Sequence, residues 1–186
     1  MVTIEQAFER IHREDFLPTN LKYIADIDAP IPIGYGQTNS QPSTVKRMLE
    51  WLNVKPENKV MDIGSGSGWT SALLSEIVGP KGAVWAVEII PELRNMSEEN
   101  CTAIGKKNIF FFLAGDQLGL PEFAPFDRIL VSAAAKNLPL RLLKQLKIGG
   151  KMVIPIKHDI LEISRILEKE YITTVHPGFA FVPLIY

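Results

Sequence analysis

Met61–Trp69, with the sequence MDIGSGSGW, decides the fold, because three glycines alternate with small residues directly after an apolar run. The run KVMDIG predicts a short buried strand, and WTSALLSEIVG after it predicts a helix. Gly64, Gly66 and Gly68 allow a sharp turn and a close approach of a ligand to the backbone, and the helix N-terminus adds free N–H groups. The stretch therefore predicts a ligand-binding turn at the edge of an α/β sheet.

Apolar runs and helix-like segments continue to alternate towards the C-terminus. Strands are predicted for AVWAVEI, NIFFFLAGD, DRILVSAA, KMVIPI and ILEISRILEKE, helices for PELRNMSEENCTAIG and PLRLLKQLKIGG, and FAFVPLIY closes the chain. Strands that are apolar on both faces are typical of a parallel sheet covered on two sides. We therefore predict a doubly wound, mostly parallel, seven-stranded α/β sheet. The last two strands have no long helix between them and are expected to form a hairpin at one edge.

The N-terminal quarter of the chain is less regular. Ile4–Ile11 places its apolar residues on one helical face, whereas prolines and two glycines interrupt any period in Asp15–Pro42. A helix is expected to resume at Pro42 or Ser43, with Ser43 or Thr44 available as its cap.

Composition limits the class of protein. The 186 residues are 46% hydrophobic and 22% charged, as in a globular domain, and the formal net charge of −1 argues against a large nucleic-acid interface. Cys101, the single cysteine, cannot form an internal disulfide, and no apolar run reaches the roughly 18 to 20 residues that span a bilayer. We expect a cytoplasmic monomer without a nucleic-acid or membrane partner.

The glycine turn does not match the common nucleotide motifs. A dinucleotide fingerprint needs its third glycine at position 69, where this chain has Trp69, whose indole would hinder close packing. A phosphate-binding P-loop needs a Lys-Ser/Thr pair, which does not follow the glycines. His12, His158 and His176 are scattered without metal-ligand spacing, so no metal site is predicted.

Three acids at successive strand ends favour a different cofactor. Asp62 precedes the turn and suits a ligand with a cationic head, while Glu88 at the second strand end can accept hydrogen bonds from ribose hydroxyls. Asp116 follows the third strand and can accept from the exocyclic amine of adenine. An amino acid, a ribose and an adenine together describe S-adenosylmethionine. Each acid alone would more often be a solvated strand end or a helix cap.

The chain resembles the protein-L-isoaspartate O-methyltransferases over most of its length. The similar segments, in the order of that family, are REDFLP, PIGYGQTNSQP, MDIGSGSGWTSALLSEIVGPKGAVWAVEIIPEL, FDRILVSAAAKNLP, LKIGGKMVIPI and FVPLI. The resemblance implies a Rossmann-like class I methyltransferase fold. It also implies methylation, dependent on S-adenosylmethionine, of L-isoaspartyl residues in damaged proteins or peptides, with S-adenosylhomocysteine as the product.

The same resemblance assigns residues to roles. It makes 1–186 one methyltransferase domain, in which 1–42 form an N-terminal segment with the active-site loop and 43–186 form the cofactor-binding core. Ser40 occupies the position of the active-site serine. Cofactor contacts are implied for Thr38, Asn39, Gln41 and Ser43 in the loop, for Asp62, Ile63, Gly64, Ser65 and Gly66 at the methionine end, for Glu88 at the ribose, and for Asp116 and Gln117 at the adenine.

Some positions depart from the family pattern, and they bear on the choice of acceptor. Asn39 stands where isoleucine is usual, Gln41 where alanine is, Ser43 where histidine is frequent, and Gln117 where glycine is. Two alternatives therefore stay open. One is a class I methyltransferase that acts on another acceptor, such as RNA or a small metabolite. The other is a module that binds S-adenosylmethionine without turnover.

Methyl transfer to a carboxylate needs positioning more than acid–base chemistry. A carboxyl group with a pKa of about 4 is already anionic at neutral pH, and the reacting atoms must be held in line about 3 to 3.5 Å apart. The small-residue loop Gly34–Ser43 is therefore expected to fold over the donor, with Ser40 as a hydrogen-bond donor to the acceptor carboxylate. The alternative is a polar turn before a helix cap. Likewise, Val131–Asn137 either leaves room for a peptide backbone or packs a helix closely on the sheet.

Overall fold

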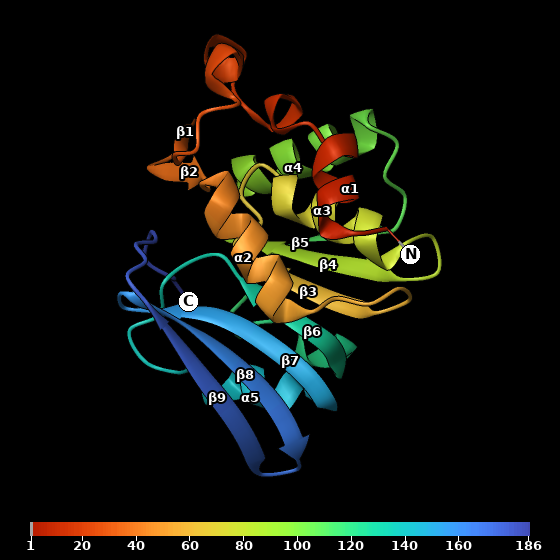
Figure 1. Cartoon of the computed structure of the whole chain (residues 1–186), viewed down its shortest axis with the longest axis vertical. Helices are drawn as coiled ribbons and strands as arrows, with labels where there is room; N and C mark the ends of the chain where they lie inside the picture. The colour runs from red at the N-terminus through yellow and green to blue at the C-terminus, as the bar shows by residue number, and fades with distance from the viewer. Residues whose placement is uncertain (1) are drawn as a thin grey trace.

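A seven-stranded sheet forms the centre of the structure, a computed structural model that describes residues 2–186 (Figure 1). The strand order is β5-β4-β3-β6-β7-β8-β9; neighbours from β5 to β7 pair in parallel, whereas β8 and β9 are antiparallel. The prediction of a mostly parallel seven-stranded sheet with an edge hairpin is therefore confirmed. The strands are β3 (Lys59–Ile63), β4 (Ala83–Glu88), β5 (Ile109–Leu113), β6 (Phe126–Val131), β7 (Leu146–Ile156), β8 (Asp159–Leu167) and β9 (Glu170–Pro177).

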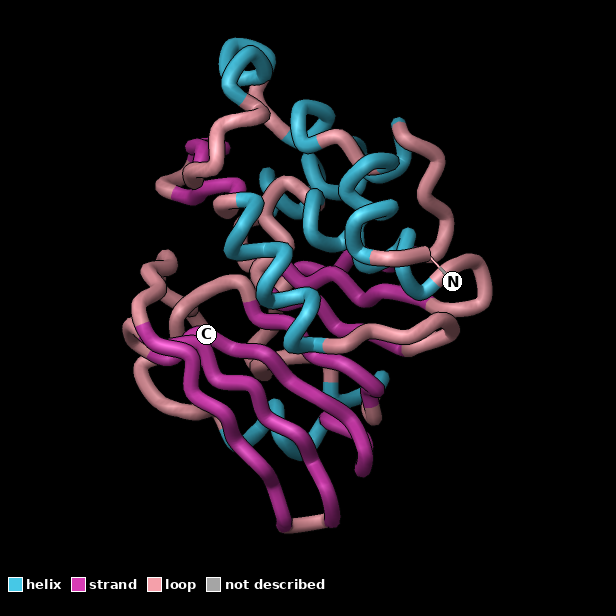
Figure 2. The backbone as a smooth tube through the Cα atoms, in the orientation of Figure 1, coloured by secondary structure: helices cyan, strands magenta, loops and turns pink. Residues whose placement is uncertain are grey.

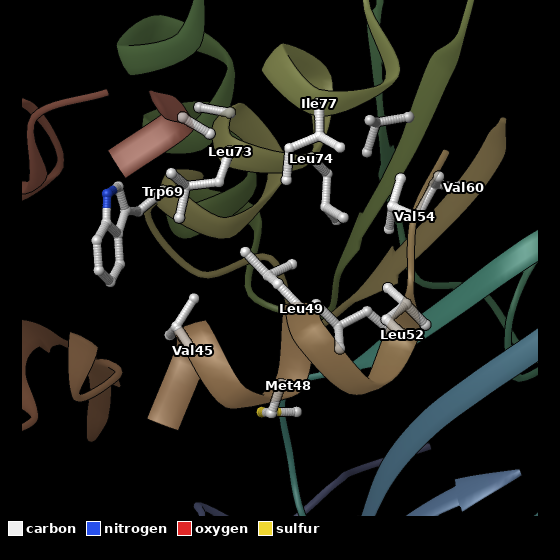
Figure 3. Packing of buried hydrophobic residues seen from close by; sticks show 14 of the residues in the cluster. Val45, Met48, Leu49, Leu52, Val54, Val60, Trp69, Leu73, Leu74 and Ile77 are labelled. Carbon is white, nitrogen blue, oxygen red and sulfur yellow. The ribbon is translucent and has the colours of Figure 1, made fainter. Parts of the chain in front are cut away.

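Helices cover the two faces of the sheet unequally (Figure 2). The helices α2 (Pro42–Leu52), α3 (Trp69–Val78) and α4 (Pro91–Ala103) pack on one face, with α1 (Ile4–Arg10) against α3, whereas α5 (Leu140–Gln145) packs against β7 with the opposite cluster of core residues. Successive strand residues alternate between two cores because the side chains of a strand point to opposite faces. Val60 belongs to the core with α2 and α3, and Met61 to the core with α5. Figure 3 shows Leu49 and Leu52 of α2 and Leu73 and Leu74 of α3 in the same buried cluster.

The C-terminal part differs in detail from the prediction. The helix α5 ends at Gln145, before the end of the predicted helix PLRLLKQLKIGG, because the chain passes directly into the eleven-residue strand β7. The seventh strand is Glu170–Pro177, which is largely exposed and therefore lacks the apolar pattern by which the other strands were predicted. The residues after Pro177 instead turn back towards the carboxyl end of β6, where Pro183 forms an isolated bridge with Ala134.

The stretch predicted as irregular holds a small hairpin of β1 (Ile31–Gly34) and β2 (Gln37–Asn39). Three successive residues at its turn have a positive φ, namely Gly34 (92°), Tyr35 (55°) and Gly36 (70°), which explains the two glycines. Short 3-10 turns at Arg13–Phe16 and Thr19–Ile24 precede it. The predicted cap of α2 is wrong: the N-cap is Gln41 without a side-chain cap bond.

Candidate active site

The glycine turn between β3 and α3 has the conformation that its sequence predicts. Gly64, Gly66 and Gly68 have φ values of 77°, 54° and 96°, a region that side chains other than glycine rarely adopt. A Cβ at position 68 would lie 2.7 Å from Ser97 Oγ and 3.0 Å from Cys101 Sγ, both on α4. Gly68 therefore lets α4 pack against the turn, and Cys101 is a buried packing residue.

Trp69 belongs to the core between α3 and the N-terminal segment. Its indole packs edge-on against Phe8 at 5.5 Å between ring centroids, and the Arg13 guanidinium lies 5.4 Å from the ring. Its side chain is 3% exposed. Figure 3 shows it in the buried cluster that also contains Val45 and Leu73. The large residue at the third glycine position thus joins the turn to α1.

Glu88 is fixed by the backbone at the end of β4. Oε2 accepts from the Gly66 N–H at 2.8 Å, and Oε1 accepts from the N–H groups of Ile89 and Ile90 at 2.8 and 3.1 Å. The carboxylate therefore also supports the glycine turn. Because each carboxylate oxygen has about two lone-pair sites, Glu88 retains acceptor capacity towards a ligand.

Asp62 lies completely buried beneath the turn. Oδ2 accepts from the Ser71 hydroxyl at 2.6 Å, while Oδ1 has no hydrogen-bond partner among the described residues. Burial raises the pKa of Asp62 to about 7, and the negative charge of Glu88 adds to the increase, although the bond from Ser71 opposes it. An unpaired buried carboxylate oxygen of this kind favours a nearby cation.

A cavity opens where β3, β4 and the segment after β6 end side by side, at the point where the strand order reverses. We call it the strand-end cavity. Of the predicted residues it brings together Thr38, Ile63, Gly64, Gly66, Glu88 and Gln117. Asp116 is exposed between the lining residues Gly115 and Gln117 and does not itself line the cavity. The rest of the wall of the strand-end cavity is largely apolar and comes from Val87, Ile89, Ile90, Ala114, Leu118 and the tail Val182–Tyr186.

Arg13 holds the loop that carries Ser40. Its guanidinium donates through Nη2 to the carbonyl oxygens of Asn39 (3.1 Å) and Ser40 (2.9 Å), and through Nε to Asn39 Oδ1 (2.8 Å). Further bonds run from Arg13 to the carbonyls of Ala25, Ile27 and Ala29. The backbone position of Ser40 is therefore set from outside the loop.

The side chain of Asn39 is used within the protein. It accepts from Arg13 and donates through Nδ2 to Ser67 Oγ at 3.3 Å, so it connects the loop to the glycine turn. Asn39 is 5% exposed. An isoleucine, which is usual at this position in the family that the sequence resembles, could form neither bond.

Gln41 and Ser43 also contact protein groups. Asp28 accepts from the Ser43 N–H at Oδ1 (2.9 Å) and from Gln41 Nε2 at Oδ2 (3.0 Å), and so caps α2 from a distant part of the chain. Both residues lie away from the strand-end cavity, on the side of Ser40 that faces α2.

A second cavity lies on that side, and we call it the helix-side cavity. Its walls are the loop and α2, with Ser40, Gln41, Ser43, Thr44 and Arg47, and the segment Pro177–Val182 opposite. Thr38, Ser132 and Val182 line both cavities. A narrow space lined by Ser40, Ser65, Gly66 and Ser132, among others, lies between the loop and the turn. Thr38 thus lines both cavities, and Ser40 lines the helix-side cavity and the narrow space beside it.

Ser132 belongs to Val131–Asn137, which the sequence offers as room for a peptide backbone, but neither Ser132 nor the tail Val182–Tyr186 was predicted to line the donor site. Ser132 follows β6, and its N–H bonds to the Ile63 carbonyl at 2.8 Å, which places it beside the turn. The tail is held by two bonds with Ala134, from the Ala134 N–H to Val182 and from the Leu184 N–H to Ala134. Strand-end position was the available signal for Ser132, and the similarity of FVPLI to the family ending was the available signal for the tail.

The strand-end cavity suits a molecule with the parts of S-adenosylmethionine. Glu88 offers carboxylate oxygens for hydroxyl groups, and the apolar wall suits a flat purine ring. Ser65 Oγ is buried without a hydrogen-bond partner among residues 2–186, as is Asp62 Oδ1, so polar groups of a ligand can satisfy or offset them. The residues present therefore fit such a group.

The residues that line the two cavities include few titratable side chains, namely Glu88, Arg47 and Tyr186. No histidine or cysteine lines either one within the described part of the chain. This composition suits an acceptor that is already an anion and needs no general base.

None of the described helices is long and apolar enough to cross a membrane.

Comparison with known proteins gives one consistent family. Residues 2–186 match the family model described as Protein-L-isoaspartate(D-aspartate) O-methyltransferase. A protein-L-isoaspartate O-methyltransferase of Ignicoccus hospitalis is 41% identical over 187 residues, covering 98% of this chain and 88% of the relative. One of Aeropyrum pernix is 47% identical over 165 residues, covering 88% of this chain and 64% of that relative.

Solved structures agree with these sequences. A Plasmodium falciparum structure, described as a protein-L-isoaspartate O-methyltransferase in complex with S-adenosyl-L-homocysteine, superimposes with a TM-score of 0.88. It is 26% identical, and the match covers 98% of this chain and 89% of that one.

The buried Asp62 predicts an unusual dependence of stability on pH. Its pKa in the folded state is about 7, above the ordinary value of 3.8, so the folded state holds the proton more tightly than the unfolded state. The free energy of unfolding should therefore fall as the pH rises from about 4 to about 7. Urea unfolding at several pH values should show this loss in the wild type, and a smaller loss in Asp62→Asn, which keeps a neutral side chain throughout. Parallel curves for the two proteins would contradict the assignment.

Proposed function

The chain belongs to the protein-L-isoaspartate(D-aspartate) O-methyltransferase family, and we propose that it methylates the free carboxylate of L-isoaspartyl residues in damaged proteins and peptides. The methyl donor is S-adenosylmethionine. One observation supports the assignment of the site: Thr38 lines both the strand-end cavity and the helix-side cavity, and Ser40 lines the helix-side cavity and the narrow space beside the glycine turn.

The residues of the strand-end cavity bind and orient the donor, which supplies an electrophilic methyl group on a positively charged sulfur. Glu88 accepts hydrogen bonds from the ribose hydroxyls, and its three backbone N–H partners keep it oriented. Gly64 and Gly66 let the backbone approach the amino-acid end, beside Ser65. Gln117 lines the adenine end, and the adjacent Asp116 is proposed to turn towards it.

Ser40 is proposed to donate a hydrogen bond to the acceptor carboxylate. Arg13 fixes the Ser40 carbonyl, so the hydroxyl is the free polar group of this residue. A hydroxyl orients an anion without competing for a proton, because its own pKa is far above neutral. The loop and the tail together keep water from the carboxylate, whose solvation would slow its attack.

Asn39, Gln41 and Ser43 are proposed to act indirectly on the donor. Their polar groups hold the loop against Arg13, Ser67 and Asp28. The loop in turn places Thr38 beside both cavities.

The division into residues 1–42 with the active-site loop and a core of 43–186 is likewise proposed on the basis of these contacts. The monomeric state, the cytoplasmic location and the absence of a nucleic-acid partner stay predictions.

A paired-peptide assay tests the function. Two peptides that differ only in Asp or isoaspartate at one site are incubated with radiolabelled S-adenosylmethionine. Label is expected on the isoaspartyl peptide alone. In isoaspartate the main chain continues through the side-chain carbonyl, so the α-carboxylate is free, whereas in aspartate the free carboxylate is at the end of the side chain. Equal labelling of both peptides, or of neither, would contradict the proposal. Labelling of RNA in a parallel reaction would support the alternative acceptor.

Replacing Glu88 by Gln should weaken donor binding. The amide loses the charge and presents an N–H₂ group to backbone N–H donors, so bonds to the ribose and to the turn are both impaired. We expect S-adenosylhomocysteine to bind about 10- to 100-fold more weakly by calorimetry. Glu92→Gln, on the exposed first turn of α4, is the matched control and should bind normally. Equal affinity of the two variants would remove Glu88 from the site.

Replacing Ser40 by Ala should slow methylation without affecting donor binding. Loss of one hydrogen bond to a charged group should lower kcat/KM for an isoaspartyl peptide about 10- to 100-fold, while the Kd for S-adenosylhomocysteine stays within about twofold. Ser164→Ala on β8, which lines neither cavity, serves as the control. Unchanged kcat/KM in Ser40→Ala would show that the hydroxyl has no role.

A further inference from the structure

The helix-side cavity carries one charged side chain, that of Arg47. Its other lining residues are neutral polar groups of the loop and of α2, and apolar or small residues of Pro177–Val182. Peptides that enter this space therefore meet a single fixed positive charge.

Arg47 is exposed and has no carboxylate partner within 4 Å among residues 2–186. Lys46, the preceding residue, differs in this respect, because its Nζ lies 3.1 Å from Glu5 Oε1. Asp28, the acid that contacts the start of α2, has its carboxylate occupied by Ser43 and Gln41. The charge of Arg47 is thus available to a ligand, whereas that of Lys46 is used within the protein.

Arg47 lies on the same side of α2 as the lining residues nearest to Ser40. Ser43, Thr44 and Arg47 are spaced by three and four residues, which places them on one helical face. Four residues of helix advance about 6 Å, and an extended peptide advances about 3.3 Å per residue. Since an arginine side chain adds its own length, Arg47 reaches chain positions within about three residues of a group held at Ser40.

We propose that Arg47 selects isoaspartyl substrates that carry a second carboxylate, from Asp or Glu, within about three residues of the isoaspartyl site. This inference rests on the proposed function. This second carboxylate suits Arg47 better than the reacting carboxylate does. An ion pair with arginine would stabilise the reacting carboxylate and make it a weaker nucleophile towards the methyl group. Arg47 acts here on peptide choice and not on the methyl transfer itself.

A peptide series tests the inference. Isoaspartyl heptapeptides carry Glu, Gln or Lys at one position at a time, from three residues before the isoaspartate to three after it. At low salt, the wild type should show a KM about two- to fivefold lower for Glu than for Lys at the best position, with similar kcat, as expected for one exposed ion pair. The difference should shrink at 0.5 M NaCl because salt screens exposed charges.

Three variants assign the effect to one residue. Arg47→Gln should abolish the difference in KM between the Glu and Lys peptides, and Arg47→Glu should reverse it. Lys46→Gln, the matched control with the same loss of charge one residue away, should keep the wild-type ratio. Thermal unfolding and the Kd for S-adenosylhomocysteine should be unchanged in the two Arg47 variants, because Arg47 makes no bond that supports the fold or the strand-end cavity. Lys46→Gln loses one exposed ion pair, with Glu5, and its thermal unfolding should therefore change only slightly.

The possible failures are distinguishable. If no isoaspartyl peptide is methylated, both the proposed function and the role of Arg47 are wrong. If all the peptides are methylated with the same KM, or if Arg47→Gln keeps the wild-type ratio, the function stands and the role of Arg47 is overturned.

Discussion

The buried guanidinium of Arg13 is the interaction on which the site depends. It is 6% exposed and has no carboxylate within 4 Å in residues 2–186, so its charge is balanced by oxygen dipoles of the segment 25–29 and of Asn39 and Ser40. Burial lowers its pKa to about 10, which leaves it protonated at neutral pH. Moving Asn39 and Ser40 away would leave the buried guanidinium of Arg13 without three of its hydrogen bonds, which is energetically costly. Arg13 therefore holds the Asn39–Ser40 end of the loop in place.

The core of the fold was predictable because its signals are local. Each strand from β3 to β7 is an apolar run, each helix has its own period, and the glycine turn requires positive φ at fixed positions. The hairpin β1–β2, the cap of α2 and the strand β9 were not predictable in the same way. The cap of α2 depends on Asp28, fifteen residues before Ser43, and β9 depends on pairing with β8. The hairpin depends on the pairing of two very short strands. None of these contacts produces a periodic pattern in the sequence.

The site residues likewise fall into those that local signals predicted and those that depend on long-range contacts. Gly64, Gly66 and Glu88 could be assigned because strand ends meet where the strand order reverses. The direction in which a side chain points could not be read from spacing. Asn39 and Gln41 carry polar groups suited to a ligand, yet Arg13 and Asp28 occupy them. Asp62 has the expected position but lies wholly beneath the turn, and its side chain does not line the strand-end cavity.

Val182 contributes to the walls of both cavities, and the tail that contains it is held to Ala134 by two backbone hydrogen bonds. A shift of this short segment that widens one cavity also reshapes the other. The strand-end cavity and the helix-side cavity therefore share one short piece of wall. Any coupling that this shared wall transmits between the two cavities is reciprocal by thermodynamic necessity.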